Sequence, residues 1–101
     1  MTLRLLQTDE IAARLEALHG WSFREDSLYR EFAFPDFAHA FGFISAIAVI
    51  AESLGHHPNW SNVYNRVTVC LTTHDVGGVT ELDFDLAQRI SVLDIKGGVY
   101  G

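Results

Sequence analysis

The sequence predicts one small domain built from both helices and strands. Two segments, 21–34 and 60–73, alternate between apolar and polar residues, as strands do. Apolar residues recur at helical spacing in three other segments, at 9–19, 37–51 and 80–93. A chain of 101 residues can bury one hydrophobic core, and no repeat or linker-like composition divides it. We therefore expect a single domain over residues 1–101.

The first element is expected to be a helix over residues 9–19. Thr8 offers a hydroxyl that can cap its N-terminus, and two acidic residues follow where the helix dipole favours negative charge. Gly20 is expected to stop the helix. The apolar residues that recur at helical spacing between these limits are Ile11, Leu15 and Leu18.

A β-hairpin is expected over residues 21–34. Apolar and polar residues alternate on both sides of the short polar run Glu25–Ser27, which is typical of two strands joined by a turn. Pro35 is expected to end the second strand, and Asp36 can cap the helix that follows.

Residues 37–51 carry no formal charge and are expected to form a helix that Gly55 ends. Their apolar positions spread beyond the stripe needed for packing on one sheet. We expect one face to pack on the sheet and another, with Phe43 and Ile50 as outward positions, on a second subunit. The alternative is burial on two sides within one subunit, for which a chain of this length has little material. A membrane span needs about twenty apolar residues and is not expected here.

Residues 60–73 are expected to form the main β segment, followed by a turn and a last helix. Fourteen residues are long for one strand, so a break near Asn65 and Arg66 is expected. The residues Thr80 to Asp83 resemble a helix-capping box. The apolar residues that share one parity of the β segment are Val63, Val67, Val69 and Leu71.

Composition and charge exclude several classes of function. The net charge of −6 repels a phosphate backbone, and no basic cluster reverses it locally, so nucleic acid is not an expected ligand. One cysteine, Cys70, cannot form an internal disulfide. No secretory signal is expected in the first twenty residues, because acidic residues interrupt them. We expect a soluble cytoplasmic protein.

The stretch from Glu52 to Trp60 holds two adjacent histidines, His56 and His57, before Pro58, where the apolar helix gives way to the β segment. Histidine has an unperturbed pKa of ~6.5, so both of its protonation states are accessible near neutral pH. The pair is therefore a candidate site of proton transfer, although an exposed turn or part of a metal site would have the same local sequence.

The spacing of the distinctive residues is more informative than the pair alone. Glu52 is followed after three residues by His56-His57-Pro58, after five more by Tyr64, after nine by His74 and after eight by Asp83. In this order and spacing the sequence resembles the pterin-4a-carbinolamine dehydratases, and the segments around Tyr64 and His74 look like that family too. Leu82 departs from the pattern, because many members carry Arg at that position.

The resemblance implies an α+β fold with the order α-β-β-α-β-β-α, in which helices cover one face of a four-stranded antiparallel sheet. It implies a lyase that dehydrates 4a-hydroxytetrahydrobiopterin to quinonoid dihydropterin and water without a metal or cofactor. Such an enzyme would recycle the tetrahydropterin cofactor of an aromatic amino acid hydroxylase, as a homodimer or homotetramer.

The resemblance also implies a catalytic set of three histidines. His56 and His74 would be the acid/base pair, because the leaving hydroxyl needs a proton while N5–H of the ring gives one up, and His57 would mainly bind substrate. The remaining expected substrate-binding residues are Glu52, Pro58, Trp60, Tyr64, Thr72, Thr73 and Asp83. For several of these a purely structural role stays open: helix capping for Asp83, packing for the aromatic residues and a solvated carboxylate for Glu52.

Two other classes of function compete with the lyase. A non-enzymatic module that stabilises another protein's oligomer would use the apolar helix for docking, but it would not need three histidines at this spacing. A zinc protein would use the histidines as ligands, but adjacent His56 and His57 would both have to turn toward one ion.

Overall fold

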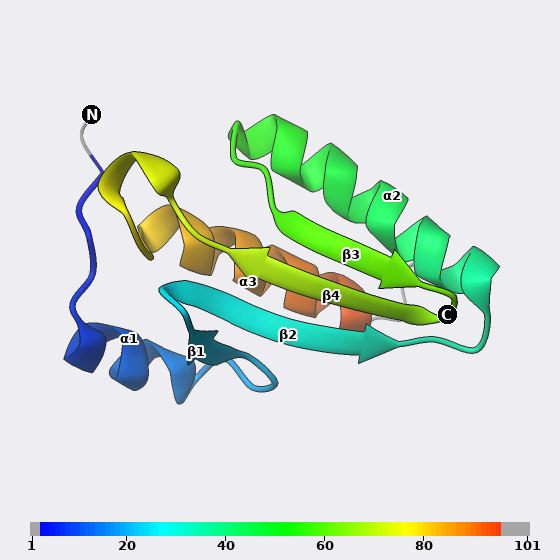
Figure 1. Cartoon of the computed structure of the whole chain (residues 1–101), viewed down its shortest axis with the longest axis horizontal. Coiled ribbons are helices and arrows are strands. Elements are labelled where there is room, and N and C mark those ends of the chain that lie inside the picture. Colours follow the sequence, from blue (N-terminus) through cyan, green and yellow to red (C-terminus); the bar gives the residue numbers. More distant parts are fainter. Residues whose placement is uncertain (1–2, 96–101) are drawn as a thin grey trace.

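The computed structural model describes residues 3–95, which form three helices and a four-stranded antiparallel sheet (Figure 1). The strands lie in the order β1-β2-β4-β3, so the first hairpin pairs with the second through β2 and β4. The elements in chain order are α1 (Thr8–Leu15), β1 (Ser22–Arg24), β2 (Ser27–Ala33), α2 (Phe37–Leu54), β3 (Asn59–Val63), β4 (Arg66–Leu71), the 3₁₀ turn η1 (His74–Val76) and α3 (Glu81–Ile95). The α-β-β-α-β-β-α order predicted through the resemblance is confirmed.

The core lies between the sheet and the helices on one of its faces. Leu28 of β2 is paired with Leu71 of β4, and Phe32 with Val67, so that buried side chains stand side by side. Helices α2 and α3 close this layer with buried aliphatic and aromatic side chains: Phe43, Ile47, Leu86 and Ile90. Alternate residues of the strands point to the opposite face, which remains largely open to solvent.

Helix α2 begins and ends where the sequence predicts. The carboxylate of Asp36 accepts a hydrogen bond from the backbone N–H of His39 at 2.9 Å, and that bond together with the His39 ring holds the pKa of Asp36 below its usual value. Gly55 ends the helix in the left-handed conformation, with φ of 64°. The fully buried side chains recur every three or four residues: Ala40, Phe43, Ile47 and Ala51.

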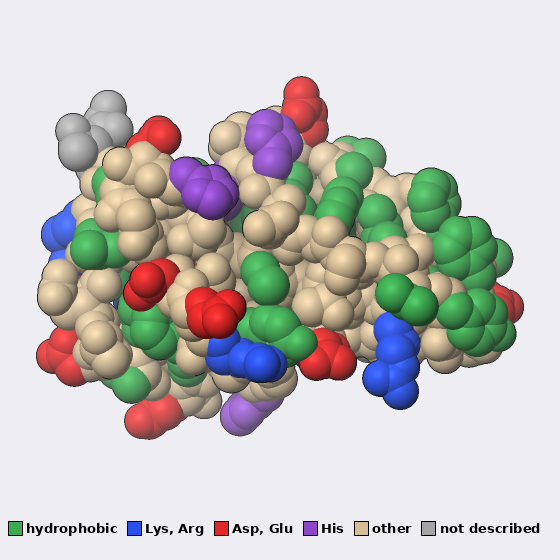
Figure 2. Space-filling view, in the orientation of Figure 1, with side chains coloured by type: hydrophobic (Ala, Val, Ile, Leu, Met, Phe, Trp, Pro, Cys, Tyr) green, Lys and Arg blue, Asp and Glu red, His purple; other side chains and the backbone are tan. Residues whose placement is uncertain are grey.

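The outer face of α2 remains uncovered. Phe37, Phe41 and Val49 are exposed there, and Figure 2 shows apolar side chains gathered along this helix. With a mean hydropathy of 1.7, α2 is also long and apolar enough, by length and composition alone, to cross a membrane. Its inner side chains nevertheless belong to the core, so the exposed side chains form one stripe of a core helix.

Four details of the sequence-based prediction are wrong. Helix α1 is capped at Gln7, whose backbone N–H donates to Glu10, and it ends at Leu15, before the predicted limit. Helix α3 extends to Ile95, beyond the predicted end. Val63 is 73% exposed, because the turn at Tyr64 and Asn65 divides the β segment and changes which face its residues point to. The predicted break itself is present at that turn.

Candidate active site

A pocket of about 240 Å³ lies where the α2–β3 loop meets the segment after β4. All three histidines of the sequence motif line it, although His74 is far from the other two in the sequence, and purple histidine side chains lie near one another at this part of the surface in Figure 2. The lining residues are Gly55, His56, His57, Thr72, Thr73, His74 and Asp75.

His56 is held from behind by a buried carboxylate. Its Nε2 lies 2.5 Å from Oδ1 of Asp83, and the side chain of His56 is 11% exposed while that of Asp83 is fully buried. The αL residue Gly55 turns the chain out of α2, and the backbone N–H of His56 still donates to Ala51. The backbone of His56 is therefore fixed at the C-terminal end of α2, and its ring contacts Asp83 of α3.

The carboxylate of Asp83 both caps α3 and bonds to His56. Its Oδ2 accepts hydrogen bonds from the Thr73 hydroxyl at 2.8 Å and from the backbone N–H of Thr80 at 2.9 Å. The second of these bonds caps α3, as the sequence predicts for a capping box. One carboxylate thus starts α3 and binds His56, and Asp83 is not among the residues that line the pocket.

His57 and His74 are placed differently from His56. The Nε2–H of His57 donates to Oε1 of Glu52 at 2.9 Å, and both side chains are exposed, at 66% and 81%. His74 begins η1 directly after β4 and is also exposed. These two rings have the freedom to adjust to a ligand, whereas His56 is fixed.

The other predicted substrate-binding residues are not all brought together. Thr72 and Thr73 line the pocket, and the hydroxyl of Thr72 donates to the backbone carbonyl of Asp26. Trp60 lines a different hollow, of about 230 Å³, formed by β3 and β4. Tyr64 is exposed in the turn at the far end of β3, and Pro58 is half-buried outside the pocket lining. Of the predicted substrate-binding residues, Glu52 and Asp83 bond to histidines and the two threonines line the same pocket, whereas Trp60 and Tyr64 lie elsewhere.

Two residues at the site were not predicted from the sequence. Asp75 lines the pocket, and Thr80 places its hydroxyl 2.9 Å from that of Thr73. Thr80 was recognisable as a helix cap, but its contact with Thr73 depends on how η1 returns the chain to α3. No spacing in the sequence reveals that contact.

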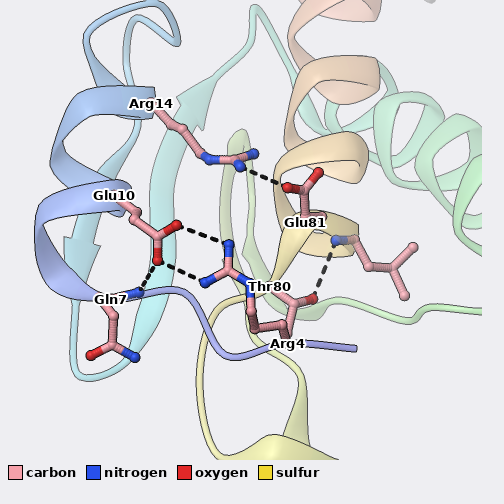
Figure 3. Close-up of polar contacts among 7 residues, drawn as sticks. Arg4, Gln7, Glu10, Arg14, Thr80 and Glu81 are labelled. Carbon is pink, nitrogen blue, oxygen red and sulfur yellow. Dashed lines mark hydrogen bonds and ion pairs between the residues drawn. The ribbon is translucent and has the colours of Figure 1, made fainter. Parts of the chain in front are cut away.

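The start of α3 is anchored to the N-terminal part of the chain (Figure 3). Arg14 of α1 pairs with Glu81 at 2.6 Å, and Arg4 forms a two-bond ion pair with Glu10 at 3.0 and 2.9 Å. The backbone N–H of Leu82 donates to the Thr80 hydroxyl at 3.2 Å. Of these contacts, the exposed pair Arg14–Glu81 joins α1 to the first residue of α3, and the Thr80 hydroxyl caps that helix locally.

Within residues 3–95, no three His, Cys, Asp or Glu side chains are grouped so as to hold a metal ion.

Comparison with protein families gives a match over nearly the whole described chain. The model described as "Pterin 4 alpha carbinolamine dehydratase" matches residues 4–93. A protein of Solibacter usitatus, provisionally named a pterin-4-alpha-carbinolamine dehydratase, is 47% identical over 92% of this chain and 97% of its own length. A similarly named protein of Rhizobium johnstonii is 44% identical over 98% of this chain and 100% of its own.

Two solved structures resemble this fold. A transcriptional coactivator/pterin dehydratase from Brucella Melitensis superposes with a TM-score of 0.86 at 43% identity, over 89% of this chain and 98% of that one. A pterin dehydratase-like protein described as a RuBisCO assembly factor in the alpha-carboxysome gives a TM-score of 0.59 at 27% identity, over 72% and 84% of the two chains.

Proposed function

Because this chain belongs to the pterin 4 alpha carbinolamine dehydratase family, we propose that it dehydrates a 4a-hydroxytetrahydropterin to the quinonoid dihydropterin and water. The observation that carries the proposal is the pocket lined by His56, His57 and His74. Histidines can exchange protons with a bound substrate at neutral pH without a further reagent.

The reaction requires two proton transfers at neighbouring atoms of one ring. Breaking the C4a–O bond requires a proton on the leaving hydroxyl, and closing the N5=C4a double bond releases the proton on N5. A positioned acid or base typically contributes ~10²- to 10⁴-fold to such a step. His56 and His74 come from different elements and line the same pocket, which supports their assignment as the acid/base pair.

Binding of the substrate would fall to the more exposed residues. We assign His57 with Glu52, together with the threonines 72 and 73, to contacts with the pterin ring. The Glu52 carboxylate is an acceptor that suits the amino and ring N–H groups of the pyrimidine edge. The substrate in the cell would be 4a-hydroxytetrahydrobiopterin or a close relative, released by a cytoplasmic aromatic amino acid hydroxylase.

A homodimer or homotetramer is part of this proposal. The exposed apolar stripe of α2 (Phe37, Phe41 and Val49) supports self-association, because apolar patches left open on a small domain usually mark an interaction site. A second subunit would also bring further residues near a pocket that one chain leaves open to solvent.

Stopped-flow measurement of the decay of a 4a-hydroxytetrahydropterin tests the activity. We expect the protein to accelerate the decay above the spontaneous rate and the His19→Ala variant to do so equally, because His19 lies outside the pocket. A decay rate that does not change over a range of protein concentrations would contradict the proposal.

A second candidate function is a non-enzymatic partner that stabilises another protein's assembly. The exposed stripe of α2 favours it, and of the two solved relatives one is a transcriptional coactivator/pterin dehydratase and the other a pterin dehydratase-like RuBisCO assembly factor. Retention of the three histidines in one pocket favours the enzyme. The stopped-flow experiment separates the two, since a pure partner protein would leave the decay at its spontaneous rate.

A further inference from the structure

We propose that Asp83, held by Thr73 and Thr80, fixes His56 in the tautomer that carries its hydrogen on Nε2, so that Nδ1 is the nitrogen that accepts the N5 proton of the pterin. The assignment of Nδ1 to the N5 proton rests on the proposed function. The tautomer itself rests only on the hydrogen-bond network behind the pocket.

The directions of the hydrogen bonds follow from the donors available. The backbone N–H of Leu82 donates to the Thr80 hydroxyl oxygen, so the hydroxyl hydrogen of Thr80 is free to be donated to Thr73. The single hydroxyl hydrogen of Thr73 then goes to Oδ2 of Asp83. Oδ2 also receives the backbone N–H of Thr80, which can only donate. Asp83 is therefore surrounded by donors on this side.

The direction of the hydrogen bond at Oδ1, the other oxygen of Asp83, follows in the same way. A fully buried carboxylate is stable when donors surround it, and an ionised carboxylate can only accept. Oδ1 has His56 Nε2 as its partner at 2.5 Å, so Nε2 supplies the hydrogen. In neutral imidazole the hydrogen on Nε2 leaves a lone pair on Nδ1.

Nδ1 of His56 is also the nitrogen that a substrate can reach. Among the described residues, no protein group bonds to Nδ1, while every fully buried side-chain nitrogen or oxygen there has a partner. Nδ1 is therefore in contact with solvent, and the residue that carries it lines the pocket. A base with its lone pair toward the pocket and a carboxylate behind it is arranged to accept a proton and to balance the charge that results.

In the proposed step one proton leaves N5 and another is added to the departing oxygen. The N5–H proton passes to Nδ1 of His56, and the N5–H bonding electrons form the N5=C4a double bond. The C4a–O bond breaks with its electron pair on oxygen, which takes a proton from the imidazolium of His74 and leaves as water. His56 ends protonated and His74 neutral, and exchange with solvent restores both.

The decisive variant is Asp83→Asn. The backbone N–H of Thr80 still needs an acceptor, so the amide must place its oxygen at the former Oδ2 and its NH₂ toward His56. His56 Nε2 would then have to accept, which moves the ring hydrogen to Nδ1. We expect ¹⁵N NMR of histidine-labelled protein to show His56 with hydrogen on Nε2 in the wild type and on Nδ1 in Asp83→Asn.

Turnover gives an independent readout. With Nδ1 protonated in the neutral ring, kcat of Asp83→Asn should fall by ~10²-fold or more while KM changes little, because no group that touches the substrate is removed. Thr72→Val is the matched control for the NMR measurement, since its hydroxyl bonds to Asp26 outside the network and the His56 tautomer should not change.

If Asp83→Asn does not fold, Thr73→Val and Thr73→Ser serve as a second pair. Read by the same ¹⁵N NMR measurement, the serine variant keeps the hydroxyl that donates to Asp83 and should leave the His56 signals unchanged, whereas the valine variant should shift the Nε2 signal. A wild-type ring with hydrogen on Nδ1, or an unchanged tautomer in Asp83→Asn, would overturn the network. A switched tautomer with full kcat would show that Nδ1 is not the base. A wild type without dehydratase activity would overturn the proposed function, and the NMR result would then still decide whether Asp83 sets the tautomer.

Discussion

His56 and His57 are neighbours in the sequence but have opposite environments. The ring of His56 is nearly buried and bonds to a buried carboxylate, whereas His57 is two-thirds exposed and bonds to an exposed one. Ordering an exposed pair costs side-chain entropy that offsets most of its attraction, so the contact with Glu52 fixes His57 only weakly. The two histidines should therefore contribute to different kinetic constants.

Single alanine substitutions test this difference. His56→Ala should lower kcat and kcat/KM together by ~10²-fold or more, because it removes a group that acts in the transition state. His57→Ala should mainly raise KM. Steady-state kinetics on both variants decides the matter, and equal effects on kcat would show that the two environments do not matter to the reaction.

The sequence predicted that three histidines share one site but not how each is held. Motif spacing singled out His56, His57 and His74, and in the structure all three line one pocket. The burial of Asp83 and its bond to His56 depend on the angle at which α3 meets the end of α2, which no local pattern encodes. For Tyr64, motif membership predicts substrate contact, and in one chain this residue lies in an exposed turn outside the pocket lining.

At the scale of elements, α2 divides cleanly into an inner and an outer face. The charge-free sequence suggested Phe43 and Ile50 as outward positions for testing self-association. The structure shows that Phe43 is fully buried and Ile50 is partly buried against the core, so neither choice isolates the outer face. Phe41 and Phe43 are the same residue type, and only the way α2 packs on the sheet leaves Phe41 exposed and Phe43 buried.

Burial of Phe43 predicts a large effect on stability. It packs against Phe32 and Phe34, with ring centroids 4.8 Å apart in both pairs. Phe43→Ala should lower the free energy of unfolding by ~3–5 kcal/mol, the usual range for a buried aromatic ring. Denaturant unfolding measures this change, and Phe41→Ala, on the outer face, should give a much smaller loss in dilute protein. Equal losses would contradict the assigned faces of α2.

The outer face predicts self-association through α2. Phe41→Glu should dissociate the oligomer without unfolding the chain, because the new carboxylate would have to be desolvated in the interface. Gln88→Glu adds the same charge on the exposed side of α3 and should leave the oligomer intact. Light scattering at micromolar concentration provides the measurement. A monomeric wild type would rule out the interface.

The capping of α1 predicts a pH dependence. Hydrogen bonds from Arg4 and from the backbone of Gln7 lower the pKa of Glu10 to about 2, from 4.5. Because the folded-state pKa is depressed, the contribution of Glu10 to stability is present above about pH 4.5 and is lost as the pH falls toward 2. Unfolding of wild type and Glu10→Gln should differ at pH 7 and converge near pH 2. A constant difference across this range would contradict the assignment.

At the scale of the whole molecule, the order of helices and strands was predictable because each element carries its own signal. Alternation in 60–73 and the Asp36 and Gly55 caps are local features that the structure keeps. The four-stranded antiparallel sheet with helices on one face was predicted only through the family resemblance, and the strand order β1-β2-β4-β3 was not predicted. Strands β2 and β4 are far apart in the sequence but pair with each other, for example at Leu28 and Leu71. Nothing in the sequence of either strand alone identifies the other as its partner.

The central claim is that His56 and His74 are the acid and base of a pterin dehydration. The most direct measurement is single-turnover stopped flow with the double variant His56→Ala/His74→Ala, after circular dichroism has shown that it folds and a stable pterin analogue has shown that it binds. We predict that the 4a-hydroxytetrahydropterin then decays at nearly its spontaneous rate. Decay at the wild-type rate by this folded, ligand-binding variant would contradict the account.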